Sequence, residues 1–301
     1  MSEAFPLMRG VRGVLTTIKT STLTIMTLHY LCPHWGSEGQ TAKTFFEAVL
    51  NEGYDGVEIN MPDDRTFIQE FNDRLSGVRE TCPGFAFIAQ CVPEGKKETV
   101  EEHIGRVLKR LETLAELQPD AINSHTGKDY YSFEENCKVI EAIEDFAEKN
   151  NVRILHETHR GRFSFHGPSL LPYLERFPQM ELVADYSHWC NVSESMLEGQ
   201  GHVLEKVLPH IGHIHARIGH PQGPQVADPF APEWHHHLDC FLSWWKDIRH
   251  YKTEKGETKL TVTPEFGPAP YMPAMPFTGE PLGDRWNINA KMKDYLKINL
   301  N

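Results

Sequence analysis

Short apolar runs rich in β-branched residues alternate along the chain with longer segments whose apolar residues recur at helical spacing. The short runs predict strands, and the longer segments predict amphipathic helices. The expected strands are residues 23–29, 54–59, 85–90, 121–125, 152–157, 181–185, 211–217 and 259–266. The expected helices are residues 41–50, 64–79, 100–117, 133–150, 169–177, 193–208 and 234–250, followed by one short helix near the end of the chain.

This alternation predicts a parallel sheet with right-handed crossovers. Eight strands at intervals of about 30 residues favour one closed (β/α)8 TIM barrel. A doubly wound sheet is disfavoured because no G-x-G-x-x-G follows the first strand. We see no linker that would divide the chain, so we expect an N-terminal arm (1–22), a barrel (23–267) and a Pro-rich C-terminal extension packed on the barrel (268–301).

Charge and cysteine usage narrow the class of protein. Formal net charge is −12, from 42 acidic and 30 basic residues, which disfavours nucleic acid as a partner. The six cysteines form no C-x-x-C pair, so a structural zinc ribbon or a disulfide framework is not expected. No apolar run approaches the roughly 20 residues of a membrane span, and residues 1–22 lack the apolar core of a secretory signal. We therefore expect a cytoplasmic protein; a homo-oligomer stays open.

Metal-capable side chains stand at the C-terminal ends of four predicted strands: Glu157, Asp185, His215 and Glu265. In a barrel these ends meet at one face. Three carboxylates brought together would repel unless a cation lay between them. Three carboxylates and one imidazole suit Mn²⁺, Mg²⁺ or Co²⁺, with Zn²⁺ as a further option. Glu58, Gln90 and His125 end other strands.

Each residue alone has a simpler interpretation. Glu157 could pair with Arg153 or Arg160. Asp185 could cap a helix. His215 could be a hydrogen-bonded core histidine, and Glu265 could flank a turn. Only their joint placement at strand ends favours a metal centre, where the ion would polarise a substrate and the two glutamates would serve as general acid and base.

Several short motifs occur in a recognisable order: Gly53 to Ile59 (Gly-Tyr-Asp-Gly-Val-Glu-Ile), the strand-end Glu157, Asp185-x-x-His188, His215-x-Arg217, and Glu265. Together they resemble the xylose isomerase-like TIM-barrel superfamily, and most closely its sugar phosphate isomerase/epimerase group with the ketose 3-epimerases. The resemblance covers residues 23–268.

The resemblance implies that Glu157, Asp185, His215 and Glu265 bind one divalent ion, most often Mn²⁺. It also implies that Glu157 and Glu265 move a proton at the carbon next to a carbonyl, and that His188 and Arg217 hold substrate oxygens. The expected enzyme is a metal-dependent sugar isomerase or epimerase that acts through a metal-bound enediolate on a small carbohydrate or polyol. A lyase or dehydratase on a keto-sugar or polyol is the alternative, and a non-catalytic sugar-binding barrel is a third.

The same superfamily includes a DNA-repair endonuclease with three zinc ions. His125 and His188 match histidines of its ligand set. Gln90, however, stands where a histidine is needed, and Asp228-Pro229-Phe230 lacks a second one. Two missing ligands and the net charge of −12 disfavour this activity.

Loops supply the remaining candidates. His125, His220 and Gln222 are candidates for substrate contacts, although a Gly/Pro-rich surface loop is an equal interpretation for residues 218–225. The run 235–237 (His-His-His) suggests an exposed polar turn. Trp35, Trp189 and Trp286 are either a wall for a sugar face or core residues. Residues 271–283 could lie over the barrel mouth.

Overall fold

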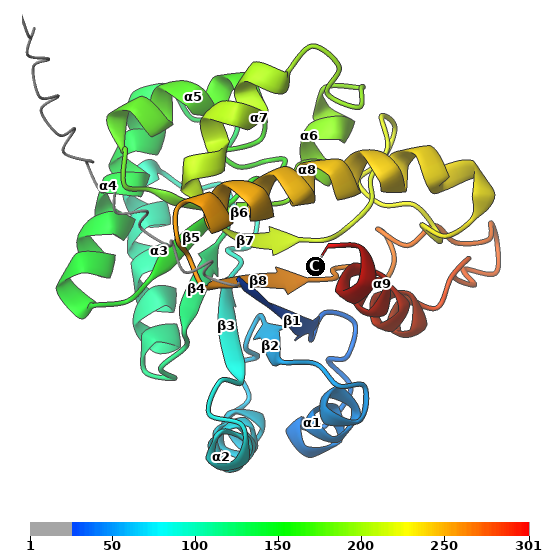
Figure 1. The fold of residues 1–301 in the computed structure, drawn as a ribbon. Helices are drawn as coiled ribbons and strands as arrows, with labels where there is room; N and C mark the ends of the chain where they lie inside the picture. Colours follow the sequence, from blue (N-terminus) through cyan, green and yellow to red (C-terminus); the bar gives the residue numbers. More distant parts are fainter. Residues whose placement is uncertain (1–25, 301) are drawn as a thin grey trace, which may run out of the picture.

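Eight parallel strands close into a barrel in the computed structural model, which describes residues 26–300 (Figure 1). Each strand pairs with the next along the chain, and the first pairs with the last. This confirms the predicted (β/α)8 barrel. The strands are β1 Thr27–Pro33, β2 Gly56–Ile59, β3 Ala86–Cys91, β4 Ala121–Ser124, β5 Ile154–Glu157, β6 Glu181–Ala184, β7 Ile211–His215 and β8 Lys259–Thr263.

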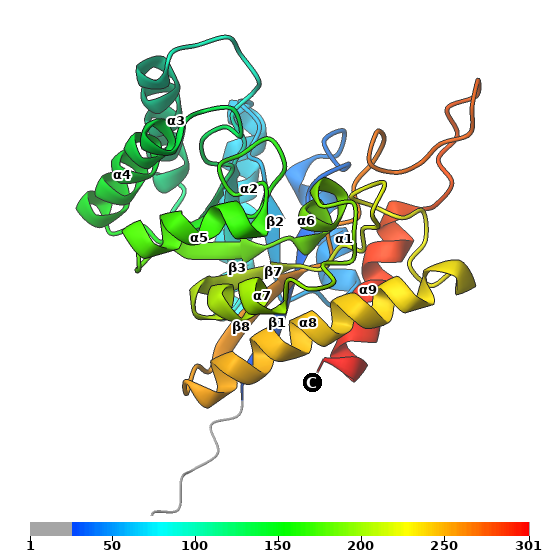
Figure 2. The same ribbon diagram turned by 90° about the horizontal axis from the view of Figure 1, so that it is seen from above.

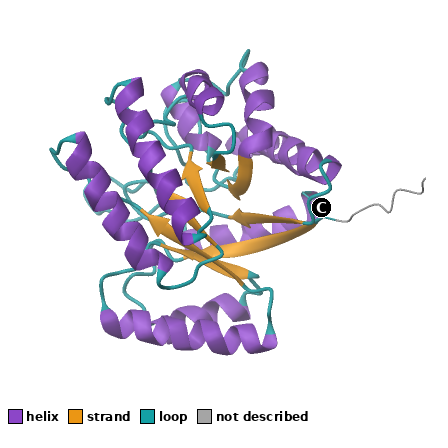
Figure 3. Cartoon of the chain, turned by 90° about the vertical axis from the view of Figure 1, so that its left-hand side faces the viewer, coloured by secondary structure: helices purple, strands orange, loops and turns teal. Residues whose placement is uncertain are grey.

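Helices surround the barrel on its outside (Figure 3). They are α1 Ala42–Asn51, α2 Arg65–Thr81, α3 Val100–Ala115, α4 Phe133–Asn150, α5 Gly167–Arg176, α6 Tyr186–Val192, α7 Gly201–Val207, α8 His235–Glu254 and α9 Arg285–Asn299, with 3-10 turns at Leu208–His210 and Pro232–Trp234. Within the described residues, no helix has the length and apolar character needed to cross a membrane.

The strands alternate between an outer apolar layer and the barrel interior. In β3, Phe87 and Ala89 join the main core, which lies between strands and helices, whereas Ile88 packs with Leu31 and Ala86 in a separate small cluster. A second small cluster joins Ala121, Leu155 and Val183. One step further along the same faces, towards the C-terminal ends, the side chains become polar: Gln90 follows Ile88, Asn123 follows Ala121, and Glu157 follows Leu155.

The helices begin where the sequence offers a capping residue. Thr99 accepts a hydrogen bond from the backbone of Glu102, whose side chain bonds back to Thr99, and Ser132 and Glu135 do the same for α4. In α3, Val107, Leu111 and Leu114 form the buried stripe at helical spacing. Local sequence and burial therefore agree over these elements.

The first strand was predicted at residues 23–29, but the structure places it at Thr27–Pro33. Residues 23–25 and the predicted arm, 1–22, lie outside the described residues. Cys32 and Pro33, predicted in a loop, belong to the strand because they pair with Val57 and Glu58 of β2. Pairing with neighbours, which the local pattern does not contain, sets these bounds.

One predicted helix is shorter in the structure. The segment 193–208 holds only α7, Gly201–Val207, and the turn before it has left-handed backbone at Glu194, Leu197 and Gly199. The preceding helix, α6, begins directly after Asp185. The final helix, α9, is longer than the short helix predicted from sequence.

The C-terminal extension completes the ring of helices. Figure 2 shows α9 beside α1, and the Lys293 ammonium donates to the carbonyl of Glu52, at the end of α1. Lys293 is buried and also lies over the Tyr54 ring, 5.0 Å from its centroid. This helix follows β8 as the other helices follow their strands.

Candidate metal centre and active site

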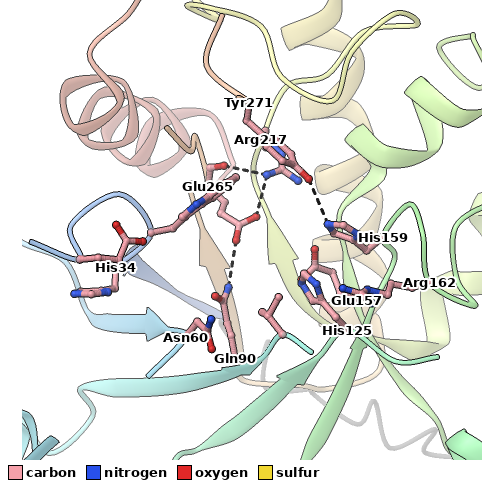
Figure 4. Close-up of a pocket in the computed structure, with 13 residues that line it drawn as sticks. His34, Asn60, Gln90, His125, Glu157, His159, Arg162, Arg217, Glu265 and Tyr271 are labelled. Atoms are coloured by element: carbon pink, nitrogen blue, oxygen red, sulfur yellow. Dashed lines mark hydrogen bonds and ion pairs between the residues drawn. The ribbon is translucent and has the colours of Figure 1, made fainter. Parts of the chain in front are cut away.

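A pocket of about 440 Å³ opens where the C-terminal ends of the strands meet (Figure 4). Strand ends form its floor, and the loops after the strands form its walls. The residues that line it are His34, Trp35, Glu38, Asn60, Gln90, Val92, His125, Glu157, His159, Arg162, Arg217, Glu265 and Tyr271.

The four predicted metal ligands lie together. Glu157 and His215 end β5 and β7, while Asp185 and Glu265 closely follow β6 and β8. Each offers one ligand atom, and these atoms all lie within 4.8 Å of one another. All four side chains are buried, with Asp185 and His215 beneath Glu157 and Glu265, which line the pocket.

His215 is oriented by Glu58 of β2. The Nε2–H group of His215 donates to Glu58 Oε1 at 2.9 Å. The opposite ring nitrogen, Nδ1, lies 2.9 Å from Glu265 Oε2 but makes no hydrogen bond. The same nitrogen lies 3.7 Å from Glu157 and 3.8 Å from Asp185. A buried imidazole nitrogen therefore points at three carboxylates.

The two carboxylate oxygens of Asp185 have different hydrogen-bond partners. Oδ1 accepts from the backbone N–H of Ser187 at 3.1 Å, which caps α6 as the simpler interpretation foresaw. Oδ2 accepts from the Arg217 guanidinium and faces His215. Burial alone would raise the pKa of Asp185, but Arg217 outweighs burial and lowers it. The carboxylate is thus charged, with one oxygen directed at the centre.

Arg217 uses most of its donors on neighbours. Besides Asp185, its guanidinium lies 3.3 Å from Glu265 Oε2, 3.2 Å from Ser187 Oγ and 2.8 Å from His188 Nε2. From its place in the sequence motif, Arg217 is expected to hold a substrate oxygen. It borders the pocket, and it also supplies one positive charge between two predicted ligands.

Negative charge still exceeds positive charge at this point. Four carboxylates are buried here, those of Glu58, Glu157, Asp185 and Glu265, and among the described residues Arg217, which pairs with Asp185 and Glu265, is the one fully buried arginine. Burial alone would lower the pKa of His215, but the surrounding glutamates outweigh it and hold that pKa well above its usual range. An oxygen-rich set with surplus negative charge and an imidazole nitrogen without a hydrogen bond fits a divalent cation.

Glu58 is a positioning residue whose role the sequence analysis did not identify. Its carboxylate accepts hydrogen bonds from five side chains and is 1% exposed. Burial alone would raise the pKa of Glu58, but His215 and His213 outweigh burial and hold it well below its usual range. The donors are Gln90 (3.1 Å), Asn123 (3.1 Å), His213 (3.1 Å), His215 (2.9 Å) and Thr263 (2.6 Å).

The two predicted proton-transfer residues stand on different sides of the pocket floor (Figure 4). Glu157 accepts through Oε2 from Asn123 (2.7 Å) and approaches His125 Nε2 at 2.9 Å, whereas its Oε1 has no hydrogen bond within residues 26–300. Glu265 accepts from Gln90 at 3.2 Å. Neither Arg153 nor Arg160 forms an ion pair with Glu157, since Arg153 pairs with Glu181 and Arg160 donates to Asn191.

Three histidine rings pack against one another, at tilted angles, along one side of the site. The His159 ring lies 4.4 Å from that of His125 and 3.9 Å from that of His188. Burial lowers the pKa of His125 and of His159 to about 3, so both are neutral near pH 7. His125, Glu157 and His159 also bring one ligand atom each within 4.8 Å of one another. His188, a predicted substrate contact, lies behind the pocket lining and touches Arg217 instead.

His159 and Tyr271 belong to the pocket, but sequence reasoning gave neither a role. His159 follows Glu157, the last residue of β5, by two positions. Tyr271 opens the segment suspected to cover the barrel mouth, and its hydroxyl lies 3.4 Å from His159 Nε2. The Tyr271 ring packs edge-on against Trp35, with centroids 4.9 Å apart. Trp35 therefore forms a wall of the pocket.

Other candidates lie elsewhere. His220 and Gln222 do not line the pocket; His220 instead packs on Trp234 at 5.0 Å between ring centroids. Trp189 is in the core, where its indole N–H donates to Ser164, and Trp286 packs against the core from outside. The histidine run begins α8 and is mostly exposed, as expected for a polar turn.

Comparisons with solved structures agree on the fold. The structure of D-allulose 3-epimerase from Methylomonas sp. superposes with a TM-score of 0.62 at 14% identity, covering 93% of this chain and 100% of that chain. The probable 3-DHS dehydratase from Bacillus anthracis gives 0.58 at 14% identity, covering 91% and 100%. The IOLI protein with a binding zinc atom gives 0.60 at 17% identity, covering 89% and 97%.

Sequence comparison identifies the family. No curated protein sequence matches the chain. A family model described as "Xylose isomerase-like TIM barrel" matches residues 46–239, which is more than half of the 301 residues. The matched region includes Glu58, Glu157, Asp185 and His215. The chain therefore belongs to the xylose isomerase-like TIM barrel family.

Proposed function

We propose that this protein is a divalent-metal-dependent sugar isomerase or epimerase. The observation that carries the proposal is the set Glu157, Asp185, His215 and Glu265, whose ligand atoms lie within 4.8 Å of one another. An ion held there, with Mn²⁺ favoured and Mg²⁺, Co²⁺ or Zn²⁺ as options, would polarise a substrate carbonyl as a Lewis acid. The similarity to a D-allulose 3-epimerase and to a zinc-containing barrel supports this assignment.

The residues of the chain supply the proton transfer. One of the two pocket glutamates, Glu157 or Glu265, removes a proton from the carbon next to the carbonyl. The electron pair then moves toward the carbonyl oxygen and gives an enediolate. The other glutamate returns a proton to the opposite face for epimerisation, or to the adjacent carbon for isomerisation. Asn123 and Gln90 orient these carboxylates through their side-chain amides.

The test is solvent deuterium exchange on a panel of ketoses, with Glu157→Gln and Glu265→Gln beside the wild type. Each variant is expected to lose about 10²-fold or more of the exchange rate, because it loses a general acid or base. Glu141→Gln, on the exposed face of α4, is the matched control and should behave like the wild type. Elemental analysis should find about one divalent ion per wild-type chain. Undiminished exchange in either pocket variant, or a wild type that retains no metal after supplementation, contradicts the proposal.

A lyase or dehydratase is the second candidate. Expelling a hydroxyl group β to the carbonyl requires an acid, and the Tyr271 phenol stands beside His159 at the pocket. Burial raises the pKa of Tyr271, so the phenol keeps its proton. One glutamate would take the carbon proton, and Tyr271 would protonate the departing hydroxyl to give water. The similarity to a probable dehydratase supports this alternative, and product analysis separates it from epimerisation.

The endonuclease and the non-catalytic sugar-binding barrel have less support. The Gln90 amide donates to Glu58 and Glu265, and the Asp228 carboxylate caps the backbone of Phe230 outside the pocket lining. Neither residue supplies the missing histidine. Three zinc ions per chain in the elemental analysis would favour the endonuclease.

A further inference from the structure

A second arginine borders the pocket on the side of the loop after β5. Arg162 lines the pocket and lies beside His125 and Glu157 in Figure 4. Its guanidinium donates one hydrogen bond, from Nη2 to the carbonyl of Pro93 at 3.3 Å. Its Nε is buried without an acceptor. Most of its hydrogen-bonding capacity is therefore unused at the surface of the pocket.

The other pocket arginine is different. Arg217 is paired with Asp185 and Glu265, at the metal side of the site. For Arg162, no carboxylate within residues 26–300 lies within 4.0 Å, the limit of an ion pair. The acid beside it in Figure 4, Glu157, instead accepts from Asn123 at 2.7 Å and approaches His125 Nε2 at 2.9 Å. Among the described residues, Arg162 is thus a pocket cation that forms no ion pair with a carboxylate.

A neighbouring ammonium group, which does not itself line the pocket, adds positive charge near Arg162. Lys128, in the loop after β4, is 4% exposed, and its Nζ makes no hydrogen bond or ion pair with the described residues. Burial, and next the charge of Arg162, lower the pKa of Lys128. Keeping two desolvated cations in each other's field, with neither in an ion pair within residues 26–300, is unfavourable. An anion bound at this wall would offset that cost.

Among the described residues, no arginine or lysine lines the opposite part of the pocket. Figure 4 places His34 and Arg162 at opposite ends of the pocket. The loop that carries His34 also supplies Glu38, an exposed acid that borders the pocket. A ligand with charge at one end would therefore be oriented, with its negative end toward Arg162.

We propose that the substrate is an anionic carbohydrate whose carboxylate or phosphate group is bound by Arg162 while its carbonyl end reaches Glu157 and Glu265. A planar guanidinium with free N–H groups can bind two oxygens of either group side by side. This inference rests on the proposed function for the identity of the reacting end. It assigns Arg162 as a residue that determines specificity.

The test is calorimetric titration of the manganese-loaded protein with D-glucitol, D-gluconate and D-glucitol 6-phosphate. The proteins are the wild type, Arg162→Gln and the control Arg153→Gln. Arg153 loses the same charge but lies before β5 and pairs with Glu181, away from the pocket. Elemental analysis first establishes that all three proteins hold equal metal, because a carboxylate or phosphate could also bind the ion itself.

The wild type should bind one anionic compound at least about 10-fold more tightly than D-glucitol, the effect of one charged hydrogen-bonded group. Arg162→Gln should lose that preference and keep its affinity for D-glucitol. The control Arg153→Gln should keep the preference. Whether gluconate or the phosphate is preferred identifies the anionic group. A preference that survives in Arg162→Gln, equal affinity for all three compounds in the wild type, or no binding of either anion at millimolar concentration overturns the inference.

The outcomes also separate this inference from the proposed function. If the wild type retains no metal yet shows the Arg162-dependent preference, the proposed metal-dependent function is contradicted and the proposed anion site is supported. If deuterium exchange requires both glutamates but neutral and anionic compounds bind with equal affinity, the proposed function is supported and the proposed anion site is contradicted.

Discussion

At the scale of single residues, the candidate site depends on a carboxylate that does not reach the pocket. Glu58 lies beneath the pocket lining and accepts from both His213 and His215. Because Glu58 can only accept at neutral pH, it fixes a hydrogen on Nε2 of His215 and leaves Nδ1 directed at the acids. Hydrogen-bond partners of this kind orient metal-binding histidines in many proteins.

Replacing Glu58 by Gln tests this role. His215 and His213 bond different oxygens of Glu58, and glutamine replaces one of these oxygens with an NH₂ group, which would oppose one of the histidines. We expect the affinity for Mn²⁺ to fall by about 10- to 100-fold, measured by calorimetric titration. The matched control is Glu47→Gln, on the exposed face of α1, with 60% of its side chain exposed. Equal affinity in Glu58→Gln and the wild type would show that His215 does not depend on Glu58.

The convergence of the four candidate ligands could be predicted from the sequence, whereas the residues that orient them could not. Glu157, Asp185 and His215 could be grouped because each ends an apolar run, a local signal. The role of Glu58 could not be predicted, because its bonds to His213 and His215 join residues 155 and 157 positions apart. Arg162 lies in a loop whose path only the folded chain defines.

At the scale of elements, two buried amide side chains hold the segment after β8. Asn289 of α9 donates to the carbonyl of Phe266 at 3.0 Å and accepts from its N–H at 2.8 Å. Gln225, from the loop after β7, makes the corresponding pair of bonds with Gly267 at 3.1 and 2.8 Å. These bonds replace the ladder that ends at Thr263, so α9 and this loop fix the backbone next to Glu265.

The variant Asn289→Leu should destabilise the protein by about 2–4 kcal/mol, because the N–H and C=O groups of Phe266 stay buried without partners. Urea unfolding measures this difference in the free energy of unfolding. The control is Asn299→Leu, since the Asn299 amide bonds only the carbonyl of Tyr295 one turn back. If both variants are equally stable, α9 does not hold Phe266.

Element positions were more predictable than element bounds. The period of 3.6 identified α3 from Val107, Leu111 and Leu114, which are buried as expected. The first strand was misplaced because an apolar run beginning at Leu23 resembles a strand, while the pairing of Leu31 with Gly56 across the barrel decides where β1 lies. The turn before α7 needs left-handed backbone at Leu197, which its side chain does not suggest.

At the scale of the whole molecule, buried histidines link stability to pH. Burial lowers the pKa of His34 to about 4, below the ordinary value of about 6.5. Between these two values the unfolded chain binds a proton that the folded chain does not. The stability present above about pH 6.5 is therefore lost as the pH falls toward 4. His125 and His159, with pKa values of about 3, act in the same direction.

Each such histidine changes the free energy of unfolding by up to about 1.4 kcal/mol for every pH unit between its pKa in the folded protein and its pKa in the unfolded chain. We expect His34→Gln to unfold with a shallower dependence on pH than the wild type when urea unfolding is compared at about pH 4.5, 5.5 and 6.5. His202→Gln changes an exposed histidine on α7 and serves as the control. Identical slopes in His34→Gln and the wild type would mean that His34 can be protonated in the folded protein.

The wall formed by Trp35 has a consequence for observing this site. Of the six tryptophans, Trp35 alone lines the pocket. Its indole lies edge-on to Tyr271 and beneath the Arg217 guanidinium at 5.8 Å. The ring is also pressed against Gly267, where an added Cβ would lie 2.1 Å from it. A rigid indole between a phenol, a cation and the cavity makes the intrinsic fluorescence of this protein a label-free signal of pocket occupancy, with Trp35→Phe as the silent reference.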